Sequence, residues 1–508
     1  METLAEIITR HSTAQPQAVA MIWRDREISY RQLQGDIVRC RRALCASSER
    51  GDRIAVLALN CPEYIALLYA VPAAGRILVP LNTRLSPLAL QQQLAQVGAR
   101  LVIGDSDHLA ALQQAADDKP LPQQIALGAP YQQWLAQYDD DADNDTDHNK
   151  DNPEQARQRP AWLLFTSGTT GRAKVAILTQ HSLLAGLDSA NCGRAVQAGD
   201  RYLYSFPLFH ISAHNVLHQH RHGAAVVLLP AFDAEAVLHN CQQHSVTTVS
   251  LAPTMIGMLL DHPSFQRERL ASLRCIGYGA SAINTALLER VQREIGCDLS
   301  QGFGMTELSG SIAFLDPDDH RHALREQPQR LQSVGRPVAG IELQLLDDKG
   351  RQVAEGEPGE IAVRGAQVAA GYWQQAQETE AAFVGGWLHT GDIGRFDSEG
   401  YLYIVDRKKD IIISGGENIA SREVEQTLCH HPHIRNAAVV GVADARWGEV
   451  VCAMIESEEV LQAEEIRAFC RRQLAGYKAP KRILFGELPL NASGKVDKQR
   501  VKVHFAES

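Results

Sequence analysis

The chain has 508 residues, of which 45% are hydrophobic and 22% charged, and its formal net charge is −10. This length favours two or more domains, and the acidic balance argues against nucleic acid as a main partner. Ten cysteines without a Cys-x-x-Cys pair are typical of reduced thiols, so we expect a cytoplasmic protein. We expect neither a signal peptide nor a transmembrane segment, because the most apolar stretch, Tyr64–Leu81, is interrupted by proline and glycine.

The first part of the chain alternates helix-like and strand-like segments. Leu33–Leu44 has the spacing of an amphipathic helix, and Arg53–Leu59 and Arg100–Gly104 are typical of buried strands. An acidic stretch that is poor in apolar residues follows. Such a stretch cannot bury enough apolar surface to fold, so we expect a disordered surface loop at about 138–158.

Further strand-like runs are separated by segments of helical length. These runs are Ala224–Pro230, Thr247–Pro253 and Arg274–Ala280, and their spacing indicates βαβ units with parallel sheets. From about Ser333 the runs are joined by Gly-containing turns, which indicates antiparallel strands. The sequence therefore predicts an α/β fold. A large N-terminal domain of parallel βαβ layers includes a small antiparallel part, and a small α+β domain follows it.

The stretch Thr166–Lys174, TSGTTGRAK, places hydroxyls, glycines and a lysine between two apolar runs. Glycines let backbone N–H groups approach a ligand closely, and successive N–H groups form an anion-binding concavity. Because Lys174 adds a positive charge, the stretch predicts a polyphosphate cradle. A flexible linker is the alternative, but linkers rarely lie between apolar runs. The stretch is not a P-loop, since its frame is Gly-x-x-Gly-x-x-Lys and Val175 follows the lysine.

Five further stretches complete a set with this loop. They are RCIGYGASAI (Arg274–Ile283), QGFGMTE (Gln301–Glu307), GWLHTGDIG (Gly386–Gly394), YIVDRKKDIIISGGENIASREVE (Tyr403–Glu425) and LPLNASGKVDK (Leu488–Lys498). The set covers nearly the whole chain and closely resembles the adenylate-forming superfamily of acyl-CoA synthetases, peptide-synthetase adenylation domains and luciferases. The resemblance implies an AMP-binding domain over residues 1–407 and a mobile C-terminal domain over residues 408–508.

The resemblance implies an acid–thiol ligase, an acyl-CoA synthetase that uses ATP, Mg²⁺ and coenzyme A. A carboxylate would attack the α-phosphorus of ATP, giving an acyl-adenylate and pyrophosphate, and the thiol would then displace AMP. Because an anion approaches a polyanion, catalysis must be mostly positioning and charge stabilisation. The residues implied at ATP and AMP are Thr166, Ser167, Gly168, Thr169, Thr170, Gly171, Lys174, Gly279, Ala280, Ser281, Gly302, Phe303, Gly304, Thr306, Asp392, Arg407 and Lys495.

Individual roles in the N-terminal motifs follow from the same resemblance. Phe303 would stack on adenine, and Thr306 would contact the α-phosphate. Glu307 and Thr169 would hold magnesium, because this hard cation prefers oxygen ligands.

The later motifs would act at the ribose and at the reacting atoms. Asp392 would accept hydrogen bonds from both ribose hydroxyls, which a two-oxygen carboxylate can do, and Arg407 would be its partner. Lys495 matches the family's catalytic lysine and would bridge the carboxylate and the α-phosphate. With Thr306 and Glu307 it completes the predicted catalytic set.

In this superfamily the C-terminal domain rotates between the two half-reactions. Lys409 matches the hinge, where a few residues absorb the backbone change. After rotation, Ser414, Gly415 and Gly416 would line the channel for the pantetheine arm of CoA, because glycines let a thiol arm pass close to the backbone.

The acyl pocket is implied at His210, Ala213, Tyr278, Gly302 and Met305. These stretches contain no arginine to pair with a second carboxylate, which disfavours a malonate-like diacid. We expect a medium- or long-chain fatty acid, or an aryl or alicyclic acid.

Two features depart from a simple match. Ala173 and Val175 replace the usual Pro and Gly of the cradle, which would affect loop mobility and ATP affinity. His210, His214 and His218 have helical spacing, so a metal site is conceivable, but no acidic or Cys ligand is nearby. We expect His210 in the acyl pocket and the other two at polar helix positions.

Two other functions stay open at this point. The chain could load a carrier protein in place of CoA, or it could be a nucleotide-binding regulator without turnover. An intact Lys495 and Glu307 argue against the regulator. The sequence leaves the oligomeric state open, a homo-oligomer included.

Overall fold

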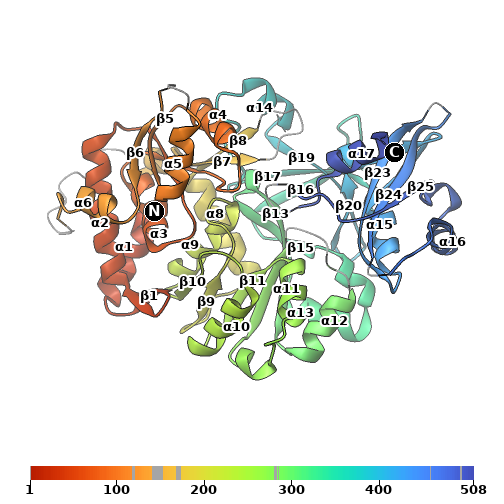
Figure 1. Cartoon of the computed structure of the whole chain (residues 1–508), viewed down its shortest axis with the longest axis horizontal. Helices are drawn as coiled ribbons and strands as arrows, with labels where there is room; N and C mark the ends of the chain where they lie inside the picture. Colours follow the sequence, from red (N-terminus) through yellow and green to blue (C-terminus); the bar gives the residue numbers. More distant parts are fainter. Residues whose placement is uncertain are drawn as a thin grey trace. The chain divides into compact units, whose positions relative to one another are not determined.

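A computed structural model of the chain describes residues 2–116, 120–139, 153–166, 173–279, 283, 285–444, 446–457, 459–491 and 495–507 (Figure 1). The chain divides into two compact units. The first comprises Met1–Glu342 and Arg364–Leu388, and the second comprises Leu343–Val363 and His389–Ser508. The predicted α/β fold is confirmed. The predicted domain boundary between residues 407 and 408 defines the part of the chain that is expected to rotate, and it stays a prediction.

The first unit contains a nine-stranded sheet whose six central strands are parallel. In spatial order its strands are β15 (Arg336–Pro337), β14 (Gly310–Leu315), β13 (Asp298–Met305), β12 (Cys275–Gly279), β11 (Thr248–Leu251), β9 (Arg201–Tyr204), β10 (Ala225–Leu228), β1 (Val19–Trp23) and β2 (Arg26–Ser29). Parallel neighbours end at the same edge, so the carboxyl ends of β12 and β13 bring two of the sequence motifs together.

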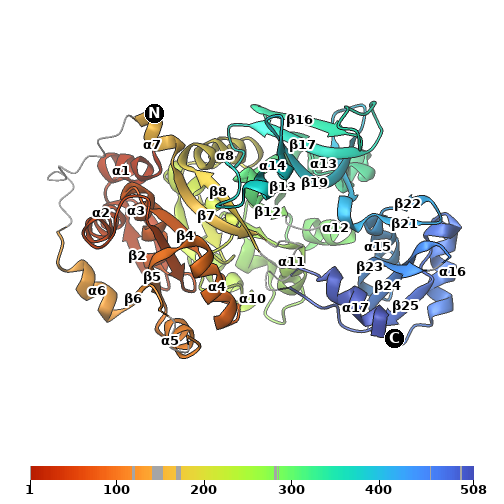
Figure 2. The same cartoon turned by 90° about the horizontal axis from the view of Figure 1, so that it is seen from above.

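A second sheet of six strands completes the core of this unit. Its order is β6 (Gln123–Ala126), β5 (Ala99–Gly104), β3 (Arg53–Leu57), β4 (Ile77–Pro80), β7 (Pro160–Thr166) and β8 (Lys174–Thr179). Only the last pair is antiparallel, and Figure 2 shows β7 and β8 side by side. The two apolar runs around the predicted cradle are therefore the two strands of one hairpin.

Fourteen helices belong to the first unit in the described ranges. They are α1 (Leu4–Ala14), α2 (Tyr30–Ser47), α3 (Pro62–Ala73), α4 (Pro87–Val97), α5 (Ser106–Gln114), α6 (Ala129–Leu135), α7 (Pro153–Gln158), α8 (Gln180–Gly193), α9 (His214–Arg221), α10 (Ala234–Gln243), α11 (Pro253–Leu260), α12 (Thr285–Glu294), α13 (Pro317–Glu326) and α14 (Ala376–Ala382). Helix α8 begins directly after β8, because Thr179 and Ser182 form a reciprocal capping box at 3.0 Å.

Two further sheets have five strands each, and all strands of the second one belong to the second unit. One has the order β16 (Ile341–Leu346), β17 (Gly359–Gly365), β19 (Trp387–Phe396) and β18 (Phe383–Val384), with β20 (Leu402–Arg407) also paired to β19. The other has β22 (Glu417–Ile419), β21 (Ile412–Ser414), β24 (Gly448–Ser457) and β23 (Ile434–Asp444), with β25 (Arg482–Phe485) paired to β24.

Helices cover both faces of the last sheet. They are α15 (Ser421–Cys429), α16 (Ala463–Gln473) and α17 (Lys498–Glu507). Val439 of β23 packs in a cluster with residues of α15 and α16, whereas the next residue, Val440, packs with Val501 and Phe505 of α17. This alternation follows from the two-residue period of a strand.

The elements expected from the sequence are largely confirmed, with boundaries shifted by a few residues. The helix expected at Leu33–Leu44 is part of α2, and the strand expected at Arg53–Leu59 is β3. The prediction of a disordered loop at about 138–158 is wrong for residues 153–158, where the chain forms α7. Residues 140–152 lie outside the described residues. In the described ranges, no helix combines the length and apolarity that a membrane crossing requires.

Candidate active site

The two ends of the predicted phosphate cradle face each other across the β7–β8 hairpin. Thr166 and Lys174 are the last residue pair of its register. The cradle residues Ser167, Gly168, Thr169, Thr170 and Gly171 lie outside the described residues. Thr166 and Lys174 therefore lie at neighbouring strand ends.

Lys174 is linked to the predicted magnesium ligand through Tyr372. The Lys174 ammonium lies 4.8 Å from the centroid of the Tyr372 ring. The Tyr372 hydroxyl donates a hydrogen bond of 3.0 Å to Oε1 of Glu307. Burial raises the pKa of Tyr372, and the Glu307 carboxylate adds to this effect, so the phenol stays a donor.

Glu307 is held rigidly in a buried position. It lies in the short 3₁₀ helix Thr306–Leu308, is 4% exposed, and its carbonyl accepts from Ala369 N at 2.8 Å. A carboxylate offers more acceptor positions than Tyr372 occupies, and its oxygens suit Mg²⁺. The residues described here therefore fit a magnesium ion at Glu307, whereas the other predicted ligand, Thr169, is outside the described residues.

The departure at Val175 has a structural explanation, and Ala173 is held through its backbone. Val175 is fully buried in the core of the six-stranded sheet, and its N–H donates to Oε1 of Gln375 at 3.1 Å. The Ala173 carbonyl accepts from Nε2 of Gln96 at 2.9 Å. The chain is thus anchored on both sides of Lys174.

The predicted adenine-binding segments lie at the carboxyl ends of β12 and β13. Gly279 and Gly302 are register partners, and a Cβ on Gly279 would lie 2.6 Å from the Gly302 carbonyl oxygen. A Cβ on Gly304 would lie 1.9 Å from the Gly310 carbonyl oxygen. Close backbone packing therefore requires glycine at positions 279 and 304. Phe303, which lies between Gly302 and Gly304, is only partly buried. The predicted residues Ala280 and Ser281 are outside the described residues.

The predicted acyl-pocket residues are only partly brought together. Ala213 is buried just before α9, and the His210 ring contacts Phe209 edge-to-face at 4.6 Å. The Tyr278 hydroxyl lies 2.8 Å from Nε2 of His320 in α13. Tyr278 and Gly277 are consecutive residues of β12, so they point to opposite faces of the sheet. The structure therefore turns the Tyr278 side chain away from the side where Gly277 meets Arg194.

Three predicted site residues from distant stretches gather in the second unit. Asp392 and Arg407 are register partners of β19 and β20, and Arg407 Nε lies 2.5 Å from Asp392 Oδ1. Lys495 interacts electrostatically with both. Its backbone is fixed by a reciprocal pair of hydrogen bonds with Asn491, at 2.8 and 3.1 Å.

The pKa values in this cluster are shifted by burial and by neighbouring charges. Burial raises the pKa of Asp392, which is 4% exposed, while the nearby Arg407, Arg422 and Lys495 oppose that rise. Partial burial of the ammonium and the positive charge of Arg407 lower the pKa of Lys495, against the attraction of Asp392. Three positive side chains, Arg407, Arg422 and Lys495, interact here with the carboxylates of Asp392 and Asp406, which suits a site for a phosphate-bearing ligand.

The predicted hinge and CoA channel occupy short turns. Lys409 is exposed in the 3₁₀ turn Lys408–Asp410, directly after β20. Gly415 and Gly416 have φ values of 63° and 88° and connect β21 to β22, and Ser414 opposes Glu417. A two-residue hairpin loop with both φ values positive favours glycine. This turn explains both glycines, while their role in a CoA channel stays a prediction.

The histidine-rich segment gives no metal centre. Across the described part of the chain, no group of three His, Cys, Asp or Glu side chains could hold a metal ion. His214 contacts the Leu183 carbonyl at 3.3 Å, and His220 bridges Tyr69 and the Ala20 carbonyl. These side chains are structural parts of α9.

Sequence reasoning missed three residues at these sites, Tyr372, Arg422 and Arg194. Tyr372 connects Lys174 to Glu307, and Arg422 is buried beside Asp392 and Asp406. Nothing in the sequence distinguishes them from ordinary surface or core residues, because their neighbours come from distant parts of the chain.

Comparisons with known proteins agree with this arrangement. The family model for AMP-binding enzymes matches residues 8–373, and the model for the AMP-binding enzyme C-terminal domain matches residues 423–495. An indoleacetate–CoA ligase from Aromatoleum aromaticum is 35% identical over 505 residues, which cover 98% of this chain and 97% of the relative. A 2-succinylbenzoate–CoA ligase from Bacillus pumilus is 34% identical over 494 residues, with 96% and 95% covered.

A solved structure gives the same result. The o-succinylbenzoate CoA synthetase from Bacillus subtilis, in complex with its acyl-adenylate intermediate, superposes with a TM-score of 0.85. It is 31% identical, and the match covers 98% of this chain and 97% of that one. Another structure of that enzyme contains ATP and a magnesium ion.

The fold, the gathered site residues and these relatives define an adenylate-forming enzyme. The chain belongs to the AMP-binding enzyme family and is an AMP-forming acid–CoA ligase that uses ATP, magnesium and coenzyme A. The non-catalytic regulator considered above is therefore not supported.

Proposed function

We propose that the acid activated by this ligase is an aromatic carboxylic acid. The observation that carries the proposal is the aromatic ring shared by the acids for which the relatives are named. On the face of the nine-stranded sheet beneath α8 and α9, Ser250 and Gly277 are register partners that both meet Arg194, and Ser300 beside Gly277 donates to the Gly193 carbonyl of α8 at 3.0 Å. Residues this small let Arg194 and α8 lie close to the sheet.

The relatives support the aromatic class. They are named for indoleacetate, for 2-succinylbenzoate and, at 34% identity over 502 residues, for ferulate. Each of these acids contains an aromatic ring.

For the adenylation step we assign roles to residues of both units. Lys174 would hold the outer phosphates, and Glu307, positioned by Tyr372, would hold magnesium, which neutralises phosphate charge when bound. Phe303 would stack on adenine and Thr306 would donate to the α-phosphate. Lys495 would stabilise the charge that builds between the carboxylate and the α-phosphate.

The ribose and the thioester step involve the second unit. Asp392, aligned by Arg407, would accept from the ribose hydroxyls. Lys409 would act as the hinge, and the turn at Ser414–Gly416 would line the path of the CoA thiol. We also propose a cytoplasmic location, supported by ten cysteines that are all free and by the use of ATP and CoA.

The test is acid-dependent release of pyrophosphate from ATP, measured with aryl, alkyl and alicyclic acids, with and without CoA. Release with aryl acids and faster turnover with CoA are the expected results. A higher kcat/KM for an alkyl or alicyclic acid would contradict the aromatic class.

A carrier protein is the second candidate acceptor. A fatty acid–[acyl-carrier-protein] ligase from Streptomyces coeruleorubidus is 31% identical over 518 residues and is covered to 97%. Pyrophosphate release that CoA does not accelerate would favour this acceptor over CoA.

A further inference from the structure

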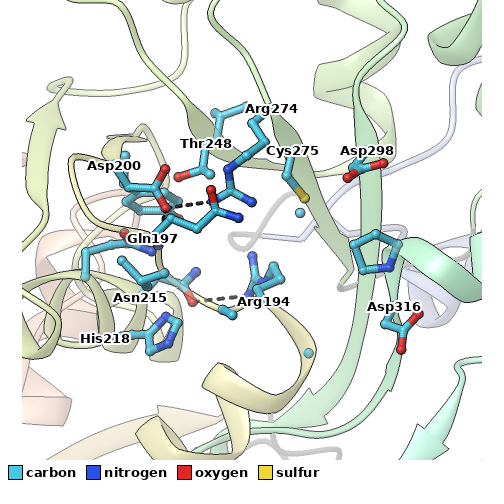
Figure 3. Close-up of a pocket in the computed structure, with 18 of the residues that line it drawn as sticks. Arg194, Gln197, Asp200, Asn215, His218, Thr248, Arg274, Cys275, Asp298 and Asp316 are labelled. Atoms are coloured by element: carbon cyan, nitrogen blue, oxygen red, sulfur yellow. Dashed lines mark hydrogen bonds and ion pairs between the residues drawn. The ribbon is translucent and has the colours of Figure 1, made fainter.

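A cavity of about 320 Å³ lies at the amino ends of β9, β11, β12 and β13 (Figure 3). This volume is within the range of sites for small ligands. Figure 3 shows Arg194 in the middle of the lining, with Asn215 and His218 of α9 beside it and Thr248 and Arg274 at the strand ends. The predicted nucleotide motifs lie at the opposite, carboxyl ends of the same strands.

Several buried polar atoms of this lining have no hydrogen-bond partner within the protein. His218 and Gln219 are 3% and 7% exposed, and neither Nε2 of His218 nor Oε1 of Gln219 has a partner. The same holds for Nε of Arg194 and Oγ1 of Thr248. An unsatisfied buried polar group destabilises a protein, so this cavity is suited to a polar group of a ligand.

Arg194 differs from the other arginines of the lining. Its guanidinium donates to the neutral oxygens of Ser250 at 2.6 Å and Asn215 at 3.4 Å. By contrast, Arg274 lies 2.6 Å from a carboxylate oxygen of Asp200, and Arg321 pairs with Asp298 and Asp318. Among the described arginines that line the cavity, Arg194 is therefore the one without a carboxylate partner.

The protein around Arg194 keeps the neighbouring imidazole neutral. Burial and the positive charge of Arg194 hold the pKa of His218 well below its usual range. A neutral ring can donate or accept at Nε2. Arg194 therefore stays the positive centre of the cavity over the physiological pH range.

The cavity is adjacent to the segment predicted to bind the acyl group. A Cβ on Gly277 would lie 2.1 Å from the Arg194 guanidinium, so this glycine makes room for the arginine. Gly277 lies two residues, or about 7 Å along the strand, before Gly279 and points to the same side. Gly279 pairs with Gly302 of the predicted acyl pocket, and α9 directly follows Ala213 of that pocket.

We propose that this cavity is the far end of the acyl pocket, and that Arg194 binds an oxygen acceptor at the distal end of the aromatic acid. The acceptor is a second carboxylate or a ring hydroxyl, and Asn215, His218 and Gln219 complete its surroundings. The proposal rests on the proposed function. The stretches predicted for the acyl pocket contain no arginine, which disfavoured a diacid. Arg194 lies outside those stretches, so that argument no longer applies.

The test compares matched acids in the full-length enzyme. Phenylpropanoic acid, its para-hydroxy derivative and its para-carboxy derivative are supplied in turn, and kcat/KM for pyrophosphate release is measured. In the wild type, at least one derivative should exceed the plain acid by about tenfold or more, because a site built for hydrogen bonds rejects an analogue that lacks the group. Arg194→Met should abolish this preference, so that kcat/KM for the two derivatives falls to that for the plain acid.

Two further variants keep the result interpretable. Arg321→Met removes a cation at the same cavity that already has carboxylate partners, so the preference should persist. Arg194→Lys keeps the charge and should retain part of the preference for the para-carboxy acid. A thermal melt of each variant checks the fold.

The outcomes separate the two proposals. A preference that survives in Arg194→Met, or an equal loss with all three acids, overturns the role of Arg194. If the wild type releases pyrophosphate with the plain acid at the same kcat/KM as with the derivatives, the cavity proposal is wrong. The proposed aromatic substrate class is not affected by that result. No release with any of the three acids contradicts both.

Discussion

The ammonium of Lys495 lies beside one carboxylate and one guanidinium, so its charge depends on two opposing neighbours. Asp392 stabilises the charged form, whereas Arg407 and partial burial disfavour it. The lowered pKa means that Lys495 loses its charge at a lower pH than an isolated lysine does. Two predictions follow at the scale of this residue.

Lys495→Ala should lower the rate of adenylation by about 10²–10³, the usual loss for one electrostatic donor. Thioester formation from a supplied acyl-adenylate should be largely spared, because the lysine acts where charge builds in the first step. Pyrophosphate release and CoA thioester formation are measured separately. Lys349→Ala, at an exposed position, is the control, and an equal loss in both half-reactions would show that this role is wrong.

The pH dependence of adenylation should reflect the lowered pKa of Lys495. The cation is the active form, so activity is fully present below this pKa and is lost as pH rises through it. Lys495→Arg keeps its charge to higher pH and should move the alkaline limb upward. The adenylation rate of both proteins is measured across the alkaline range, and coincident limbs would assign the titration to another group.

Motif order predicts the charged residues of the site, because their spacing in the chain resembles that of the superfamily. Tyr372 and Arg194 could not be found in this way. Tyr372 pairs with Ala176 of β8, and this pairing brings it between Lys174 and Glu307. Arg194 follows α8 and becomes significant only where Gly277 leaves it space.

At the scale of elements, α9 contains three histidines that are buried in neutral form. Burial lowers the pKa of His214 and His220 to about 4 and that of His218 well below 6.5. In the unfolded chain each has a pKa near 6.5. The unfolded state therefore binds more protons between these values, and the free energy of unfolding falls as pH decreases from about 6.5 to about 4.

His214 and His220 each contribute a pH dependence on the order of 3 kcal/mol across this window. His220→Gln should flatten the dependence of unfolding free energy on pH, because one buried imidazole no longer has to be protonated on unfolding. Urea denaturation across the window measures it, with His430→Gln at an exposed position as the control. An unchanged slope in His220→Gln would assign the acid sensitivity to other groups.

Two glycines should respond to substitution in opposite ways. Gly304→Ala should lower the melting temperature by several degrees and impair ATP binding, because its Cβ would collide with the Gly310 carbonyl where β13 meets β14. Gly257→Ala in α11 has no atom within 4 Å and should stabilise the protein by about 0.5–1 kcal/mol. Thermal melts of both variants test this pair, and equal stability would contradict the close packing at Gly304.

Strand and helix identity followed from hydrophobic periodicity, as β3, β12 and α2 show. Composition was less reliable at the acidic stretch. Residues 153–158 form α7 despite few apolar side chains, because the helix lies against α8 and Ala156 is 6% exposed. Tertiary packing decides such a case, and sequence composition alone cannot register it.

At the scale of the whole molecule, the prediction concerns the proposed hinge at Lys409. Lys409→Pro fixes φ near −65°, which suits the 3₁₀ turn at Lys408–Asp410 but prevents a large change of backbone angle. Thioester formation should be blocked while adenylation persists. Lys409→Ala keeps the backbone free and should retain both half-reactions, and unimpaired CoA transfer in the proline variant would contradict domain rotation.

The sequence by itself determined the class of the enzyme and its cofactors, and it predicted the charged site residues. These depend on motifs whose members lie within a few residues of one another, so their local order is enough. Tertiary structure alone decided which side chains meet across strands. It placed Tyr372 against Glu307, turned Tyr278 toward His320 and set Arg194 over Gly277. Strand register and the two-residue alternation of a sheet fix these contacts, and both arise only when distant segments pair.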